Sequence, residues 1–224
     1  MRPARFTSFA LLALLCACAS GPPAPDWQGN ARGSMDRAVA AYLAGDTRTA
    51  TSELERARGA VASTGRLDLL ARVELMYCAA RVASLEFESC DAFEKRRADA
   101  AAPERAYADY LAGHVQPGDI ASLPGAQRDI AKVGSDAAGA AAVKGIADPL
   151  SRLVGAGVLF QSGRASPALL SLAVETASAQ GWRRPLLAWL NVQRMRAEKA
   201  GDATAVEQLR RRIEVVEQSG VPAK

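Results

Sequence analysis

Prolines and glycines divide this chain of 224 residues into segments of helical length. Proline is tolerated in the first turn of a helix, and four prolines open segments with helical apolar spacing: Pro103, Pro149, Pro167 and Pro185. Asp148 and Ser166 directly precede two of them, as N-caps do. Glycines suited to left-handed C-caps close the segments: Gly45, Gly65, Gly113, Gly163, Gly181, Gly201 and Gly220. This punctuation predicts roughly nine or ten helices.

The composition between these markers favours an all-α fold. Alanine dominates, aromatic residues make up 5% of the chain, and no long Val/Ile/Thr segment alternates as a β-strand would. Residues 66–85 are apolar over too broad a surface for a helix with one wet face, so we expect that helix to be buried between neighbours. Residues 203–218 carry a narrow apolar stripe, which is typical of the last helix of a stack.

Residues 38–57 place small and large apolar side chains at regular distances on both sides of a Gly45-Asp46 turn. These side chains are Ala38, Tyr42, Ala50, Leu54 and Ala57. The spacing resembles a tetratricopeptide repeat across its inter-helix turn. Weaker matches to the same spacing occur around Gly118-Asp119, Gly163 and Gly201-Asp202. The resemblance implies antiparallel helix pairs stacked as a tetratricopeptide-like solenoid. The alternative is an irregular alanine-rich helical bundle.

A short apolar segment follows two arginines at the start of the chain, and the run Leu15-Cys16-Ala17-Cys18 closes it. This arrangement resembles the lipobox of bacterial lipoproteins. The resemblance implies cleavage after Ala17 and lipidation of Cys18, and Ala19 in the next position implies sorting to the outer membrane. The alternative is an ordinary secretory signal that is cut after Ala17 or Ala19.

These patterns divide the chain into three parts. Residues 1–17 are the expected signal peptide, residues 18–33 the lipidated cysteine and a Pro/Gly-rich tether, and residues 34–220 a single all-α tetratricopeptide-like domain.

The formal net charge is +4, and removing Arg2 and Arg5 with the signal leaves +4 − 2 = +2. Because this charge is small and its signs are interleaved along the chain, we exclude nucleic-acid binding.

Two cysteines lie outside the leader, Cys78 and Cys90. Cys78 falls late in one expected helix and Cys90 at the start of the next, so that a hairpin between them would bring the thiols together. An envelope lipoprotein meets an oxidising periplasm, which favours a disulfide between them. The alternative is a small buried Cys78 and a free thiol at Cys90.

A search for chemical motifs yields no catalytic residue, no metal ligands and no cofactor site. His114 is the only histidine, which excludes a site with several histidine ligands. The Gly155-Ala156-Gly157 run begins like a dinucleotide fingerprint, but Phe160 takes the place of its third glycine and no strand precedes it. Close packing of two helices explains this run better.

Trp182, Arg183 and Arg184 form the best candidate for a contact with a partner, because tryptophan and arginine are enriched in interface hot spots. The alternative is that Trp182 and Trp189 fill space in a core poor in aromatic residues.

Together these features predict a non-enzymatic scaffold or adaptor, lipid-anchored in the outer membrane with its domain in the periplasm. Its expected partners are the membrane, through the N-terminal lipid, and a protein or peptide of the cell envelope. Two other classes stay open. A helical carrier of a small apolar ligand would need an internal apolar cavity, and a cell-envelope hydrolase would need polar residues that converge in a cleft, such as His114 beside an acid and a serine.

Overall fold

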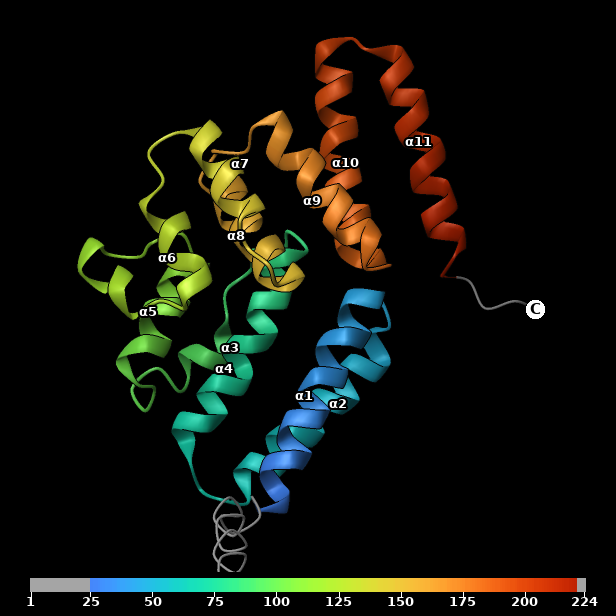
Figure 1. Cartoon of the computed structure of the whole chain (residues 1–224). Coiled ribbons are helices and arrows are strands. Elements are labelled where there is room, and N and C mark those ends of the chain that lie inside the picture. The colour runs from blue at the N-terminus through green and yellow to red at the C-terminus, as the bar shows by residue number, and fades with distance from the viewer. Residues whose placement is uncertain (1–24, 221–224) are drawn as a thin grey trace, which may run out of the picture.

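The structure is a computed structural model that describes residues 25–220 (Figure 1). The predicted signal peptide and the lipidation site Cys18 lie outside these residues. The described part contains eleven α-helices and one 3-10 helix and no strand, so the prediction of an all-α fold is confirmed. The helices are α1 (Asp26–Ala44), α2 (Thr47–Ala62), α3 (Leu67–Ala83), α4 (Asp91–Glu94), α5 (Ala102–Leu111), η1 (Pro117–Ser122), α6 (Gly125–Lys132), α7 (Asp136–Lys144), α8 (Pro149–Gln161), α9 (Pro167–Ala179), α10 (Arg183–Ala200) and α11 (Ala203–Gln218). Among these helices, none has both the length and the apolar character that a membrane span requires.

Side-chain caps begin the helices where the sequence predicted them. The carboxylate of Asp148 accepts a hydrogen bond from the Ser151 N–H at 2.7 Å, and the Ser166 hydroxyl accepts one from the Leu169 N–H at 3.2 Å. Each cap satisfies an N–H group that has no partner within its helix, and Pro follows both caps at the first helical position. The caps therefore fix where α8 and α9 begin.

The tetratricopeptide-like spacing forms the hairpin of α1 and α2. The three alanines of that spacing are fully buried where the helices approach each other, and the larger Tyr42 and Leu54 are buried beside them. Gly45 has φ of 88°, in the left-handed region that the turn requires. The Gly201-Asp202 turn joins α10 to α11 in the same way, but Gly118-Asp119 lies within η1 and joins no hairpin.

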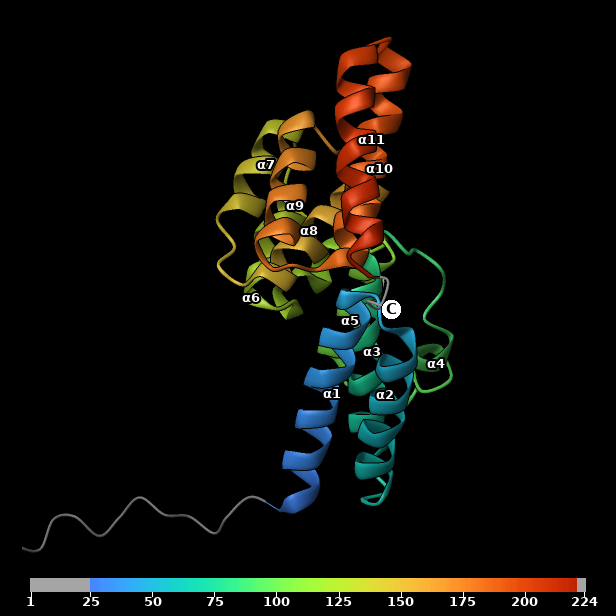
Figure 2. The ribbon, with the colours of Figure 1, turned by 90° about the vertical axis from the view of Figure 1, so that its right-hand side faces the viewer.

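Helix α3 lies at the centre of the molecule and packs against α1, α2, α4, α5 and α8, as its broad apolar surface predicted. Helix α11 packs chiefly on α10 and buries only Val206 and Ile213, as a terminal helix does. Figures 1 and 2 show the α10–α11 hairpin at one end of the molecule and the α1–α2 hairpin at the other. Because α3 contacts α8 and α1 contacts α10, helices far apart in sequence are neighbours. This arrangement is an irregular bundle built from helical hairpins.

The predicted boundary between tether and domain requires a correction. Helix α1 begins at Asp26, so residues 26–33, which the sequence analysis assigned to the tether, are helical. Gly29 and Gly33 suggested a flexible segment, yet Ala31 and Met35 are buried against α2 and α3 in one apolar cluster. Their burial offsets the unfavourable helix propensity of the two glycines.

Cys78 and Cys90 are joined by a disulfide, with an S–S distance of 2.02 Å and a Cα–Cα distance of 6.1 Å. Cys78 lies in the last third of α3, and Cys90 occupies the N-cap position of α4. The bond therefore ties the loop before α4 to the central helix.

Replacing both cysteines by serine should lower the free energy of unfolding by about 2 to 3 kcal/mol, because the bond restricts a short loop in the unfolded chain. Urea unfolding followed by circular dichroism measures this loss. A reductant should reproduce it in the native chain and change nothing in the double variant. Equal unfolding midpoints for the oxidised and the reduced native chain would contradict the prediction.

Candidate functional site

The predicted contact residues Trp182, Arg183 and Arg184 lie at the start of α10, where α10 meets the turn between α1 and α2. The Arg184 guanidinium donates hydrogen bonds to the Tyr42 carbonyl oxygen and to the Thr47 hydroxyl, both at 2.8 Å. It also lies 4.3 Å from the centre of the Tyr42 ring, a cation–π contact. Burial raises the pKa of the Tyr42 hydroxyl well above its usual range, so the ring stays neutral beneath the cation.

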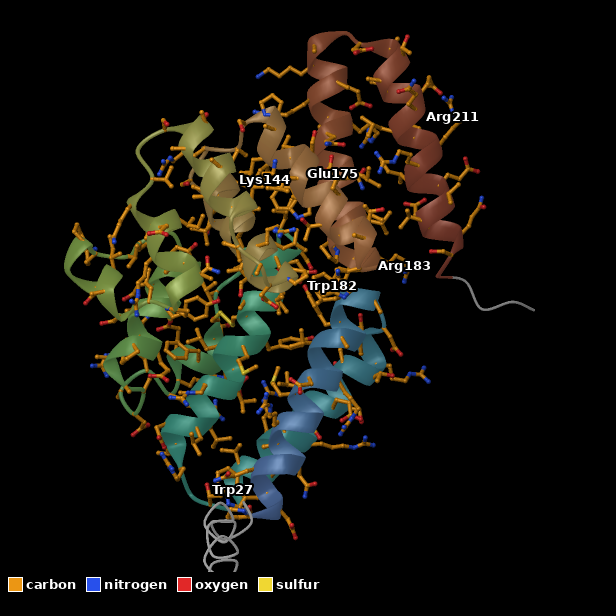
Figure 3. All side chains as sticks on the ribbon, viewed as in Figure 1. Trp27, Lys144, Glu175, Trp182, Arg183 and Arg211 are labelled. Atoms are coloured by element: carbon orange, nitrogen blue, oxygen red, sulfur yellow. A yellow bond between two sulfur atoms is a disulfide. The ribbon has the colours of Figure 1, made fainter. Side chains whose placement is uncertain are left out.

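Arg183 and Trp182 complete this junction. The Arg183 side chain donates a hydrogen bond to the Ala44 carbonyl oxygen at 3.3 Å, and the half-buried Trp182 packs against two of the hydrophobic clusters. Figure 3 shows both residues between α10 and the end of the α1–α2 hairpin. The three residues thus hold two parts of the same molecule together. These contacts within the domain explain all three residues without a partner.

Trp189 fills the core, as the alternative interpretation held. Its side chain is fully buried, its indole N–H donates to the Ala83 carbonyl oxygen at 3.1 Å, and its ring meets Phe160 edge-on at 5.7 Å.

An open groove runs beside these core contacts, between α9 and α11. Both helices pack on α10, and α9 and α11 have little or no direct contact with each other (Figure 1). One hollow of the groove has a volume of about 550 Å³ and is open to solvent. It is lined by Ser178 of α9, by Leu186 and Leu190 of α10, and by Gln208, Arg211, Arg212, Val215 and Val216 of α11.

A second open hollow, of about 570 Å³, lies between the first half of α9 and the second half of α10. It is lined by Pro167, Leu170, Ser171, Gln193, Arg196, Ala197, Lys199 and Ala200. Ser171 in this hollow and Ser178 in the first are seven residues apart, and hence on one face of α9. On α10, Leu186, Leu190, Gln193, Ala197 and Ala200 follow helical spacing along one stripe, with Arg196 and Lys199 to one side of it. The two hollows therefore follow one another along α9 and α10, and α11 lines the first of them only. We call the two together the α9–α11 groove.

The α9–α11 groove combines an apolar floor with positive charge. Leu186 and Leu190 lie buried at its base, whereas Val215 is 67% exposed on its wall. The four charged residues in its lining are all exposed cations: Arg196, Lys199, Arg211 and Arg212. Within residues 25–220 none of the four forms an ion pair.

Three glutamates near the groove bear on this charge. Glu214, three residues after Arg211 on α11, accepts a hydrogen bond from Gln218 at 3.2 Å and forms no ion pair within residues 25–220. Glu207 lies four residues before Arg211 on α11, but it pairs with Arg210 at 2.7 Å. Glu175 is exposed on α9, four residues after Ser171 and three before Ser178, and therefore lies on the α9 face that borders both hollows, although it lines neither. The residues that line the groove therefore carry a net positive charge, which favours an occupant with negative charge.

A separate pocket of about 330 Å³ lies beside the disulfide and brings His114 near Ser89 and Glu94. The His114 side chain is exposed and makes no hydrogen bond within the described residues, while the Ser89 hydroxyl donates to Asp91. The acid–histidine–serine relay of a hydrolase requires a chain of hydrogen bonds, and these residues do not form one. Residues 25–220 also contain no group of three or more His, Cys, Asp or Glu side chains placed to hold a metal ion.

Sequence reasoning missed the α9–α11 groove. One signal was present, since Val215 lies off the apolar stripe that packs α11 on α10 and is 67% exposed. The angle between α9 and α11, which opens the groove, depends on how successive hairpins pack. That angle is not encoded in the pattern of any one helix.

Comparison of the chain with protein-family models, with characterised proteins and with solved structures gives no match.

Proposed function

We propose that this protein is a lipid-anchored adaptor of the bacterial outer membrane, whose periplasmic helical domain holds a segment of a partner protein in the α9–α11 groove. The observation that carries this proposal is the groove itself: two open hollows that follow one another along α9 and α10, with buried leucines at the base of the first. A recessed apolar floor with a polar rim is the usual anatomy of a protein-binding surface.

The anchor and the compartment rest on the start of the chain and on the cysteines. The Leu15-Cys16-Ala17-Cys18 run resembles a lipobox. The disulfide between Cys78 and Cys90 is consistent with an oxidising compartment such as the periplasm. A lipid on Cys18 would hold the domain at a membrane surface, where an adaptor meets its partner at high effective concentration.

The groove favours an adaptor over the two alternatives. A carrier of a small apolar ligand encloses most of its ligand's surface, whereas both hollows of the groove are open to solvent and rimmed by cations. A hydrolase needs its acid, base and nucleophile in contact, and the pocket beside the disulfide lacks those contacts.

Site-specific photocrosslinking in cells tests the adaptor function. A photoreactive residue at Ser178 or at Gln208 samples the two walls of the groove, and the same residue at the exposed Ser52 of α2 serves as the control. We expect one abundant protein captured from both groove positions and not from Ser52. Equal capture from all three positions, or capture from none, would reject the groove as the binding site.

Cys18→Ala should release the protein from the membrane fraction into the soluble periplasmic fraction, because the lipidated thiol is lost. Fractionation followed by immunoblotting measures the shift, and Cys16→Ala is the matched control that should stay with the membrane. Retention of the Cys18→Ala variant in the membrane fraction would refute lipidation at this residue.

A further inference from the structure

The charge and the shape of the α9–α11 groove specify the chemistry of its occupant. We infer that the partner segment is an acidic amphipathic helix, which lies along α10 between α9 and α11. This inference rests on the proposed adaptor function and adds to it the conformation and the charge of the segment that is bound.

The backbone of the groove favours a helical occupant. The groove is lined entirely by helices, whose interior N–H and C=O groups are paired within each helix. An extended peptide would find no edge strand to bond to, and its own backbone groups would be desolvated unpaired against the apolar floor. A helix satisfies its backbone internally and can lay an apolar stripe on Leu186, Leu190 and Val216. It would complete the layer that α9 and α11 leave open over α10.

The length of the groove sets the length of this helix. Helix α10, which forms the floor, has 18 residues, and at about 1.5 Å per residue it is about 27 Å long. Because the lining residues run from Leu186 to Ala200, a partner helix of about four turns covers both hollows.

The positions of the charges determine which flank of the partner is acidic. Arg211 and Arg212 line the α11 wall, and Arg196 and Lys199 line the far end of the groove on α10. All four are exposed and none is paired within residues 25–220, so that acidic side chains of a partner can reach them without breaking an ion pair of the domain. Glu175 lies on the α9 side, so we expect the flank that faces α9 to be neutral or basic.

An anionic membrane surface fits the groove less well. Peripheral binding to a bilayer requires apolar side chains that protrude beyond the cations, whereas Leu186 and Leu190 are 8% and 1% exposed at the base. Only Val215 protrudes from the α11 wall. The apolar face of a helix is narrow enough to enter the groove and contact the leucines at its base. A flat bilayer surface does not reach them.

Fluorescence anisotropy of the full-length protein with two synthetic helical peptides tests the inference. The peptides have about 18 residues and the same leucine stripe, and their flanks carry glutamate in one and lysine in the other. We expect the glutamate peptide to bind at least about tenfold more tightly than the lysine peptide, and to bind more weakly as salt is added.

Charge-reversal variants locate the preference. Arg211→Glu combined with Arg212→Glu should abolish the preference for the glutamate peptide. The control combines Arg32→Glu with Arg48→Glu, two exposed arginines of the α1–α2 hairpin that form no ion pair within residues 25–220, and it should keep the preference. Because all four arginines are exposed, we expect unchanged circular dichroism for both double variants, and binding is compared only between folded proteins.

Three results would overturn the inference. The first is equal binding of the two peptides. The second is failure of both peptides while Ser178 and Gln208 still crosslink a partner in cells, which would leave the adaptor function standing with an occupant of other chemistry. The third is that the protein binds neither peptide but binds phosphatidylglycerol vesicles, and that reversing the charges of Arg211 and Arg212 abolishes this vesicle binding. The groove would then be a lipid-binding site. Failure of the crosslinks as well would overturn the proposed function too.

Discussion

Gly157→Ala should lower the free energy of unfolding by about 2 to 3 kcal/mol or more, and we expect this single methyl group to have one of the largest effects in the molecule. A Cβ at Gly157 would lie 2.4 Å from the carbonyl oxygen of Val82 and 3.0 Å from its Cγ1. The nearest obstacle is backbone, which cannot rotate away as a side chain can. Helix α8 would have to withdraw from α3, which lies buried at the centre of the core.

The matched control is Gly59→Ala in α2, since nothing lies within 4 Å of a Cβ built at Gly59. There, alanine gains helix propensity without a clash, and stability should rise by up to about 1 kcal/mol. The same substitution thus has opposite signs at two helical glycines. Urea unfolding of both variants by circular dichroism measures the difference. A Gly157→Ala protein as stable as the native chain would show that α8 does not approach α3 this closely.

The local structure of the chain was largely predictable from the sequence. Helix starts at Asp148 and Ser166, the hairpin around Gly45-Asp46 and the bridge between Cys78 and Cys90 all depend on contacts between residues near in sequence. Such contacts leave a local pattern, because caps, turns and short loops each require particular residue types at fixed spacing.

The associations between distant helices were not predictable in the same way. The run Gly155-Ala156-Gly157 predicted close helix packing, but nothing in it identified α3 as the partner helix. No sequence pattern around Arg184 indicates its contact with Tyr42, which is 142 residues away. Tryptophan beside arginine occurs both in junctions within a protein and in interfaces between proteins, so these residue types alone do not distinguish the two. The α9–α11 groove was hidden for the same reason, since its walls come from three helices. The boundary between tether and domain was predicted too late in the chain, because glycine disfavours a helix within residues 26–33. The burial of Met35, which stabilises that helix, depends on contacts with other helices that the pattern of one segment does not show.

Trp189→Ala should lower the free energy of unfolding by about 3 to 5 kcal/mol, the range for removing a large aromatic side chain from a core. Trp189 is fully buried, and it connects helices that are far apart in sequence. Its indole N–H bonds to the carbonyl oxygen of Ala83, the last residue of α3, and its ring contacts Phe160 of α8. Because α3 ends at Ala83, no following helical N–H donates to this carbonyl oxygen, and the indole N–H of Trp189 donates to it instead.

Trp189→Phe separates the hydrogen bond from the packing. Phenylalanine keeps most of the buried ring and loses the donor, which leaves the Ala83 carbonyl oxygen unpaired and should lower stability by about 1 to 3 kcal/mol. The same change at Trp182, which is half-buried and donates no hydrogen bond to the described residues, should have a smaller effect. Urea midpoints of the Trp189→Ala, Trp189→Phe and Trp182→Phe variants rank these effects. If Trp189→Phe were no more destabilising than Trp182→Phe, the bond to Ala83 would contribute nothing, and ring packing alone would join α10 to the core.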